Sequence, residues 1–390
     1  METLGYAIRV FRHNDEGFKA LKNVNVLIYW PHGVGDFVFL GYILPLLEPT
    51  NRYWVTRFGD DMVSVMEGSE LVTPIYTGQV KANDGRNWGN RHFGLKYEEL
   101  HNEEYLITVP KGLHNVLMKN CINVLFWSGF PETYGHVSYP FHSKARNVIP
   151  NMVSEEIILS TQLNSPLRNS ISLHVDSWLQ RWVESRLATF TGFPDRKLCL
   201  IGRNGHTNID KNWGHRWRED MPEGKRIQGE ECRDFMKLLL KKDPNWMFLS
   251  IEDRCFEGEH TLRSKELNAF TYADLFGYGD ASRLPFGLVM KALINLADLA
   301  VGVPAGMLFL SSLRNDLPTV GIWTAHLPSW YYEPGQSAIH VISKNIVDSR
   351  LDQRPGSFES RYGLHFNQLK VDTRIITGEQ VLFAVEKLIA

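Results

Sequence analysis

The turn His32-Gly33-Val34-Gly35-Asp36 follows a short apolar run and combines two glycines with a carboxylate. Glycine lets a ligand approach the backbone closely, and the start of the next helix offers free N–H groups. A carboxylate there disfavours a bound phosphate but suits a general base. Asp36 is therefore the candidate catalytic base, in a turn that also includes His32, Gly33 and Gly35. The alternative is that Asp36 only caps the helix.

A second polar turn follows the apolar run at residues 197–201 and is rich in cations. Arg203, Lys211, Arg216 and Arg218 lie within sixteen residues, with Asn, Thr and Gly between them. Charged hydrogen bonds from such a loop can hold a diphosphate. We assign Arg203, Gly205 and Lys211 to the binding of a diphosphate. A solvated basic loop is the alternative.

A third turn, Val301-Gly302-Val303-Pro304-Ala305-Gly306-Met307, joins a strand pattern to a helix pattern. Gly306 and Met307 would then present backbone N–H groups to an anion at the helix start. The sequence contains no H-E-x-x-H and no D-x-D, so no metal site is predicted. We expect cations and helix ends to meet the charge of a diphosphate instead.

Alternating strand and helix patterns occur twice along the chain. The first set predicts strands at residues 24–30, 53–58, 72–76 and 105–109, helices after residue 36 and at 62–66, and a mainly helical stretch at 155–187. After the breaker cluster at 191–195, the second set predicts strands at 197–201, 246–251, 299–303 and 318–323, and helices at 231–241, 286–296 and 307–313. Thr377 and Gln380 fit a capping box for a last helix.

These patterns predict two doubly wound α/β domains that face one another across a cleft. We place the first domain at residues 1–190 and the second at residues 191–390. The last helix, over 377–390, can pack back on the N-terminal domain. Each domain would carry candidate residues at the carboxyl ends of its strands.

Composition narrows the class of protein. The 390 residues carry 42 Lys and Arg against 44 Asp and Glu, for a net charge of −2, which argues against a nucleic-acid binder. The four cysteines form no C-x-x-C pair, and no window of 18 apolar residues predicts a transmembrane segment. The sequence opens without a secretory h-region. We expect a cytoplasmic protein; its oligomeric state is open.

The three turns, in this order and at these separations, resemble the heptosyltransferase-like glycosyltransferases of family 9, which have the GT-B fold. The matching segments are GVGDFVFLGYILPLL, KLCLIGRNGHTNIDKNW and the stretch from ALINLADLAVGVPAGM to PTVGIWTAHLPSWYYEP. The resemblance implies an inverting, metal-independent transfer from a nucleotide-sugar to a hydroxyl of a saccharide, lipid-linked or protein acceptor. It also implies that residues 1–190 form the acceptor-side domain, with His32, Gly33 and Gly35 in its acceptor turn. Residues 191–390 would then form the nucleotide-sugar domain, whose diphosphate site binds the donor. The resemblance implies no cofactor, because the nucleotide-sugar is a substrate.

Two positions depart from the family pattern. Pro304 stands where the family has an acidic residue, and Phe309 stands where it has a histidine, both of which contact the donor. These departures favour a noncatalytic binding or scaffold protein that kept the fold, whereas Asp36 and Lys211 favour the enzyme. A nicotinamide-dependent dehydrogenase is a weaker alternative, because no complete G-x-G-x-x-G is present.

Overall fold

The computed structural model divides the chain into two compact units. It describes residues 2–12, 15–30, 33–57, 62–77, 93, 95, 101–128, 152–154, 156–157, 168–191, 193–203, 229–251, 262–277, 284–323, 338–343, 368–371 and 375–389. Unit 1 comprises Met1–Ser172 and Pro285–Leu288, and unit 2 comprises Leu173–Leu284 and Val289–Ala390. The division between Ser172 and Leu173 differs from the predicted boundary near residue 191.

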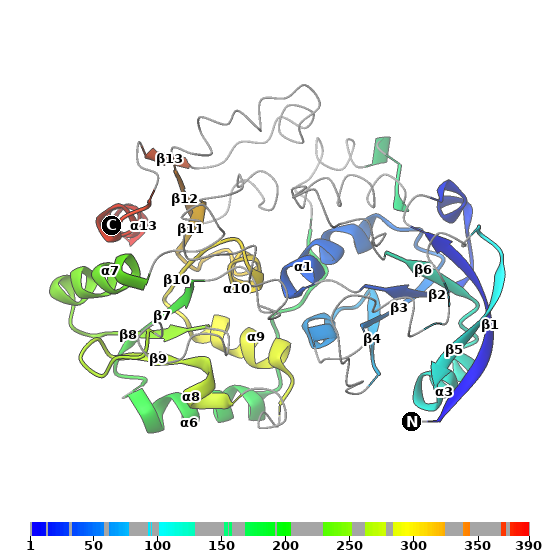
Figure 1. Cartoon of the computed structure of the whole chain (residues 1–390), viewed down its shortest axis with the longest axis horizontal. Coiled ribbons are helices and arrows are strands. Elements are labelled where there is room, and N and C mark those ends of the chain that lie inside the picture. The colour runs from blue at the N-terminus through cyan, green and yellow to red at the C-terminus, as the bar shows by residue number, and fades with distance from the viewer. Residues whose placement is uncertain are drawn as a thin grey trace. The chain divides into compact units, whose positions relative to one another are not determined.

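Unit 1 is built on a sheet in the order β4-β3-β2-β6-β1-β5 (Figure 1). Its described strands are β1 (Thr3–Arg12), β2 (Asn25–Tyr29), β3 (Arg52–Arg57), β4 (Val72–Tyr76), β5 (Glu104–Pro110) and β6 (Val124–Trp127). Its described helices are η1 (Glu16–Ala20), α1 (Val34–Ile43), η2 (Leu44–Leu46), η3 (Met62–Met66) and α3 (Lys111–Lys119). The predicted strands and the helix after Asp36 are present, but β1, α3 and β6 were not predicted.

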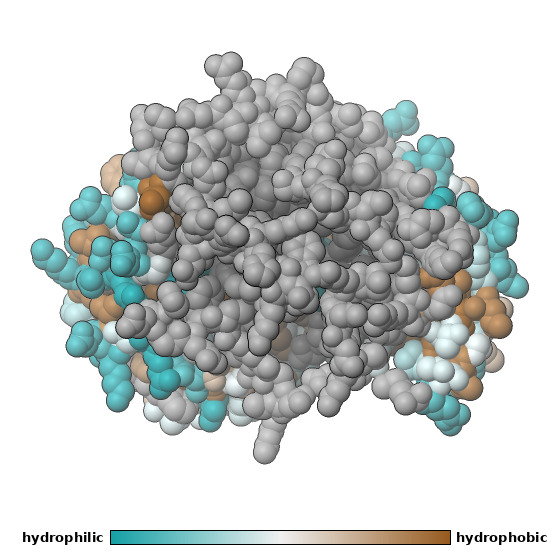
Figure 2. All heavy atoms as spheres, in the orientation of Figure 1, coloured by the Kyte–Doolittle hydropathy of each residue, from teal (hydrophilic) through white to brown (hydrophobic). Residues whose placement is uncertain are grey.

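The strand β1 joins the antiparallel edge of this sheet to its parallel part. It pairs antiparallel with β5, from Thr3 opposite Pro110 onward, and parallel with β6, from Arg9 opposite Val124 onward. Leu106, on the outer face of β5, is 74% exposed and lies over Gly5. Figure 2 shows hydrophobic surface, in brown, on the side where Figure 1 draws β1, β5 and α3.

Unit 2 has a parallel sheet in the order β13-β12-β11-β10-β7-β8-β9. Its described strands are β7 (Lys197–Gly202), β8 (Trp246–Ser250), β9 (Ala269–Thr271), β10 (Leu299–Gly302), β11 (Thr319–Trp323), β12 (Ala338–Ser343) and β13 (Gln368–Val371). Its described helices are α6 (Ser177–Thr191), α7 (Gly229–Lys242), α8 (Tyr272–Phe276), α9 (Phe286–Leu296), whose first residues belong to unit 1, α10 (Gly306–Ser311) and α13 (Gly378–Ile389). Both units are therefore α/β and doubly wound, as predicted.

The last helix, α13, belongs to unit 2, and its apolar face packs in the core of that unit. Val381, Leu382, Ala384 and Val385 are buried in one hydrophobic cluster with α7 and the sheet. The predicted capping box is confirmed: Gln380 Oε1 accepts from the Thr377 backbone N–H at 3.0 Å, and Gln380 N donates to Thr377 Oγ1 at 3.3 Å. Glu231 Oε2 of α7 accepts from Gly378 N at 2.9 Å.

The stretch before α6 is not helical over residues 170–176, although the sequence predicted helix there. Its polar groups bond to other elements instead. Ser170 N donates to Gly41 O at 2.9 Å, and Asn169 Nδ2 donates to Val38 O at 2.8 Å, both within α1. A Cβ on Gly41 would collide with the Asn169 side chain. This glycine therefore lets the segment lie directly on α1.

Candidate functional site

In unit 1 the candidate base lies on the first turn of α1, directly after the central strand β2. The helix has Gly33 as its N-cap, which makes Asp36 its third residue. Asp36 Oδ2 accepts a hydrogen bond from Gly33 N at 2.7 Å, and the residue is half-buried. Asp36 therefore caps the first turn of its own helix, as a carboxylate at the third helical position does. A carboxylate has further lone pairs beyond the one that Gly33 uses.

The sheet of unit 1 reverses its strand order at β2, which lies between β3 and β6. Ligands of doubly wound sheets bind outside the carboxyl ends of the strands at such a point. Two hydrogen bonds hold these ends together: Ser128 Oγ donates to Tyr29 O at 2.6 Å, and Trp30 N donates to Thr56 O at 3.0 Å. The strand end from which the turn with Asp36 begins is therefore held in place by its neighbours.

In unit 2 the strand order reverses between β7 and β10. Gly202 and Gly302 end these strands and lie opposite each other in the parallel register. Arg203, the next residue after β7, is only 4% exposed, and its Nη1 lies 2.7 Å from the position of a Cβ on Gly229, the first residue of α7. It is a buried cation at the strand end, not a solvated one on a loop.

The third turn leads into the short helix α10, with Ala305 as its N-cap and Gly306 and Met307 as its first residues. The two departures, Pro304 and Phe309, are both buried, and Phe309 is only 4% exposed. From Val303 to Met307 the turn contains no polar side chain. Hydrogen bonds from this turn to a ligand can therefore come only from its backbone.

A solved structure shares this arrangement of strands and helices. A family 9 glycosyl transferase from Veillonella parvula matches with a TM-score of 0.52 over 94% of this chain and 98% of the other, at 12% identity. The chain has the fold of a family 9 glycosyl transferase. That likeness confirms the predicted GT-B fold.

Two further structures match over 94% of this chain. They are the E. coli ADP-heptose heptosyltransferase II, with a TM-score of 0.49 over 98% of that protein at 14% identity, and the dodecameric glycosyltransferase TibC from enterotoxigenic E. coli, with 0.45 over 76% at 11% identity. No protein-family model and no curated protein matches the sequence.

Three of the predicted site residues, His32, Gly205 and Lys211, lie outside the described residues. Of the others, Asp36, Gly33 and Gly35 share the first turn of α1 in unit 1. Arg203, Gly306 and Met307 lie at the carboxyl ends of β7 and β10 in unit 2. Each group is thus assembled within its own unit.

Sequence reasoning missed two buried cations. Arg57 is 8% exposed at the carboxyl end of β3, beside the strand that leads to Asp36. Lys291 is fully buried in α9. The signal in each case was a single cation within or at the end of an apolar run, VTR and VMKAL. Both are buried cations, one at a strand end and one within a helix, and neither was assigned a role from the sequence.

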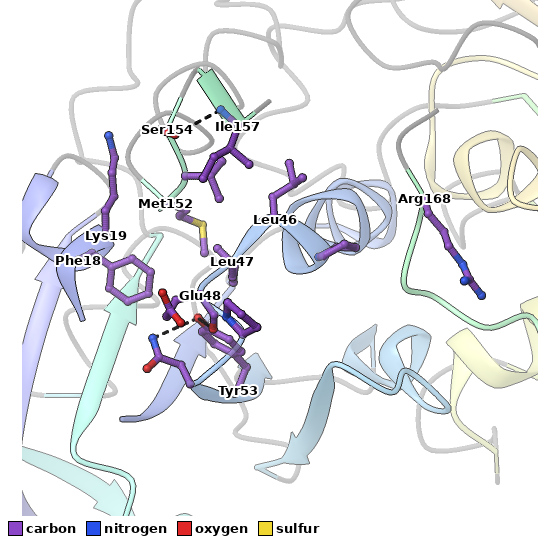
Figure 3. Close-up of a pocket in the computed structure, with 14 residues that line it drawn as sticks. Phe18, Lys19, Leu46, Leu47, Glu48, Tyr53, Met152, Ser154, Ile157 and Arg168 are labelled. Carbon is purple, nitrogen blue, oxygen red and sulfur yellow. Dashed lines mark hydrogen bonds between the residues drawn. The ribbon is translucent and has the colours of Figure 1, made fainter. Parts of the chain in front are cut away.

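A cavity of about 600 Å³ lies in unit 1, away from the turn that bears Asp36. In Figure 3 the side chains of Phe18, Leu47 and Met152 border it. It adjoins the end of α1 and the amino end of β3, whereas Asp36 is at the start of α1. Burial raises the pKa of Tyr53 at its edge to about 12. We assign no step of the chemistry to this cavity.

In the part of the chain that the structure describes, no helix is long and apolar enough to span a lipid bilayer. The same residues include no group of three His, Cys, Asp or Glu side chains arranged to hold a metal ion.

A buried histidine lies on β12 in the sheet of unit 2, two strands away from β10. Trp323 Nε1 donates to His340 Nδ1 at 3.0 Å, and both side chains are at most 1% exposed. Gly321, opposite His340, makes this possible, because a Cβ there would lie 2.6 Å from both nitrogens. Nδ1 is an acceptor in this bond, so the imidazole is neutral.

We expect His340 to make stability depend on pH. Burial lowers its pKa from 6.5 to about 3, so between these values the unfolded chain binds a proton that the folded chain does not. The contribution of His340 to the free energy of unfolding is constant above pH 6.5. As the pH drops from 6.5 toward 3, this contribution lowers the free energy of unfolding by at most about 1.4 kcal/mol per pH unit. Denaturant unfolding at pH 7 and pH 4.5 should show this loss. His340→Gln keeps an acceptor for Trp323, and it should lose less stability than wild type between pH 7 and pH 4.5. Equal losses in the two proteins would mean that His340 does not cause the pH dependence.

Proposed function

We propose that this chain is a glycosyltransferase that moves a sugar from a nucleotide-sugar donor to an acceptor hydroxyl. The observation that carries the proposal is the position of Asp36, on the first turn of the helix after the central strand of a GT-B fold. The fold likeness supports the class of reaction. A saccharide, a lipid-linked sugar and a protein side chain are the acceptors we consider.

In the proposed reaction the acceptor oxygen attacks the anomeric carbon directly, with inversion. A bond forms between that oxygen and the carbon while the bond from the carbon to the donor diphosphate breaks. The electron pair of the broken bond leaves with the diphosphate. Asp36 takes the hydroxyl proton, which keeps positive charge from building up on the acceptor oxygen.

The leaving diphosphate develops negative charge that must be stabilised. In the proposal Lys211 and the buried Arg203 supply cations, and the backbone N–H groups near Gly205, Gly306 and Met307 supply hydrogen bonds. Such a donor site needs no metal ion. We also propose that the protein acts in the cytoplasm and has no nucleic-acid partner.

A noncatalytic binding protein is the second candidate, and two observations favour it. The carboxylate of Asp36 bonds to Gly33 N, which accounts for it as a helix cap. Pro304 and Phe309 stand where the family has an acidic residue and a histidine, so the third turn offers a donor no polar side chain. A binding protein would bind the nucleotide-sugar but would not transfer the sugar, so a transfer assay separates the two candidates.

Replacing Lys211 with alanine is expected to weaken binding of nucleoside diphosphates by about 1–3 kcal/mol if its charged hydrogen bond to the diphosphate is buried. A thermal-shift panel of nucleotides and nucleotide-sugars would first identify the base, because a ligand of the folded state raises the melting temperature. Calorimetry would then compare the variant with Lys241→Ala, a change on the exposed last turn of α7. Unchanged affinity in Lys211→Ala would make Lys211 a surface cation.

A further inference from the structure

The side chain of Met307 occupies the point where the strand order of unit 2 reverses. Its Cε lies 2.7 Å from the position that a Cβ on Gly202 would take and 2.9 Å from the corresponding position on Gly302. These two glycines are neighbours at the ends of β7 and β10. With no side chains of their own, they leave a space at the strand ends, and the methionine fills it.

Three observations show that this side chain is held in place. Met307 is only 5% exposed. Ser311 Oγ, one helical turn later, donates to Met307 O at 2.9 Å and lies 3.4 Å from Met307 Sδ. Val303 N donates to Gly202 O at 2.8 Å, which ties the start of the turn to β7 beneath the thioether. The methionine side chain therefore forms a fixed, non-polar cover over Gly202 and Gly302.

We propose that Met307 is a specificity-determining residue, which sets how deeply a nucleotide-sugar can approach the ends of β7 and β10. This inference rests on the proposed function. A thioether gives a diphosphate no hydrogen bond and keeps it from the backbone of Gly202 and Gly302. The part of the donor that meets the Met307 side chain is therefore uncharged, and the diphosphate binds instead to backbone N–H groups and to Arg203.

The test compares Met307→Ala with Met307→Leu in calorimetric titrations of nucleoside diphosphates and their sugars. Alanine opens the space over the glycines, and the affinity for the donor that wild type prefers is expected to fall about tenfold or more, the usual effect of lost non-polar contacts in a pocket. Leucine has a similar volume and should keep both the affinity and the order of preference.

A second arm tests the packing without any ligand. A Cβ on Gly202 conflicts only with the end of the Met307 side chain; its other neighbours lie at 3.8 Å. Gly202→Ala should therefore lower the melting temperature in wild type but not in a Met307→Ala background. Gly302→Ala is the matched control, because its Cβ would also lie 3.1 Å from Gly202 O, so removing Met307 should not rescue it fully.

The outcomes separate this inference from the proposed function. If wild type binds a nucleotide-sugar and Met307→Ala binds the same series with unchanged affinities, the inference fails and the proposed function stands. Additive effects of Gly202→Ala and Met307→Ala on the melting temperature would also overturn it. If wild type binds no nucleotide or nucleotide-sugar of the panel, the proposed function fails and the inference fails with it.

Discussion

Replacing Asp36 with asparagine is expected to leave the fold and donor affinity unchanged and to lower the rate of sugar transfer about 10²–10⁴-fold. Asparagine is nearly the same size, and its side-chain oxygen can still accept the hydrogen bond from Gly33 N. It cannot take a proton from an acceptor hydroxyl, and general base catalysis contributes a factor of this size. Transfer to an acceptor is the rate to measure, with donor hydrolysis as a second readout.

Asp274 provides a matched control for this variant. It is the third residue of α8, and its Oδ2 accepts from the backbone N–H of the N-cap, Thr271, at 3.0 Å. The residue is half-buried like Asp36, and Oδ1 forms an ion pair with the exposed Arg263 at 3.1 Å. Asp274→Asn should therefore change the rate little. A wild-type rate in Asp36→Asn would reduce Asp36 to the same capping role and favour the binding protein.

Gly378→Ala is expected to destabilise the fold by about 1–3 kcal/mol, because the added methyl group meets backbone that cannot rotate away. Its Cβ would lie 2.5 Å from Phe235 N and 2.8 Å from Glu231 O of α7. Relief of this overlap requires α13 to move off α7, which exposes its buried apolar residues and strains the bond from Gly378 N to Glu231. Denaturant unfolding measures the loss.

Gly112 is the corresponding control. It is a helical glycine in α3, and a Cβ there would have no neighbour within 4 Å. Gly112→Ala should stabilise the protein by a few tenths of a kcal/mol to about 1 kcal/mol, because alanine favours the helix. If both alanine variants had the same stability as wild type, α13 would not depend on close contact with α7.

The parts of the fold that were predictable are those in which local pattern and tertiary packing agree. The helix at 286–296 was predicted with the bounds it has, because its apolar run begins after Pro285 and ends before Asp298. The stretch at residues 170–176 was predicted as helix and is not. Its hydrogen bonds run to α1 and to Asn295 Nδ2, which donates to Leu173 O, and no local pattern reveals such partners.

The candidate site was predictable in part for a similar reason. A glycine turn between a strand and a helix is a local feature, so the positions of Gly33, Asp36 and Gly306 followed from the sequence. The packing of Met307 over Gly202 and Gly302 joins residues about a hundred positions apart and required the sheet order. The burial of Arg203 against Gly229 also depends on where α7 begins.

The pairing of β1 has a consequence for how the chain folds. Its two neighbours in the sheet, β5 and β6, are made about a hundred residues later, since Thr3 pairs with Pro110 and Arg9 with Val124. During synthesis β1 thus leaves the ribosome long before its partners and has both edges open until they emerge. Closing so long a loop is slow, and unpaired strands tend to aggregate. The first strand of this sheet is therefore enclosed late, and a chaperone that shields it in the interval would raise the yield of folded protein.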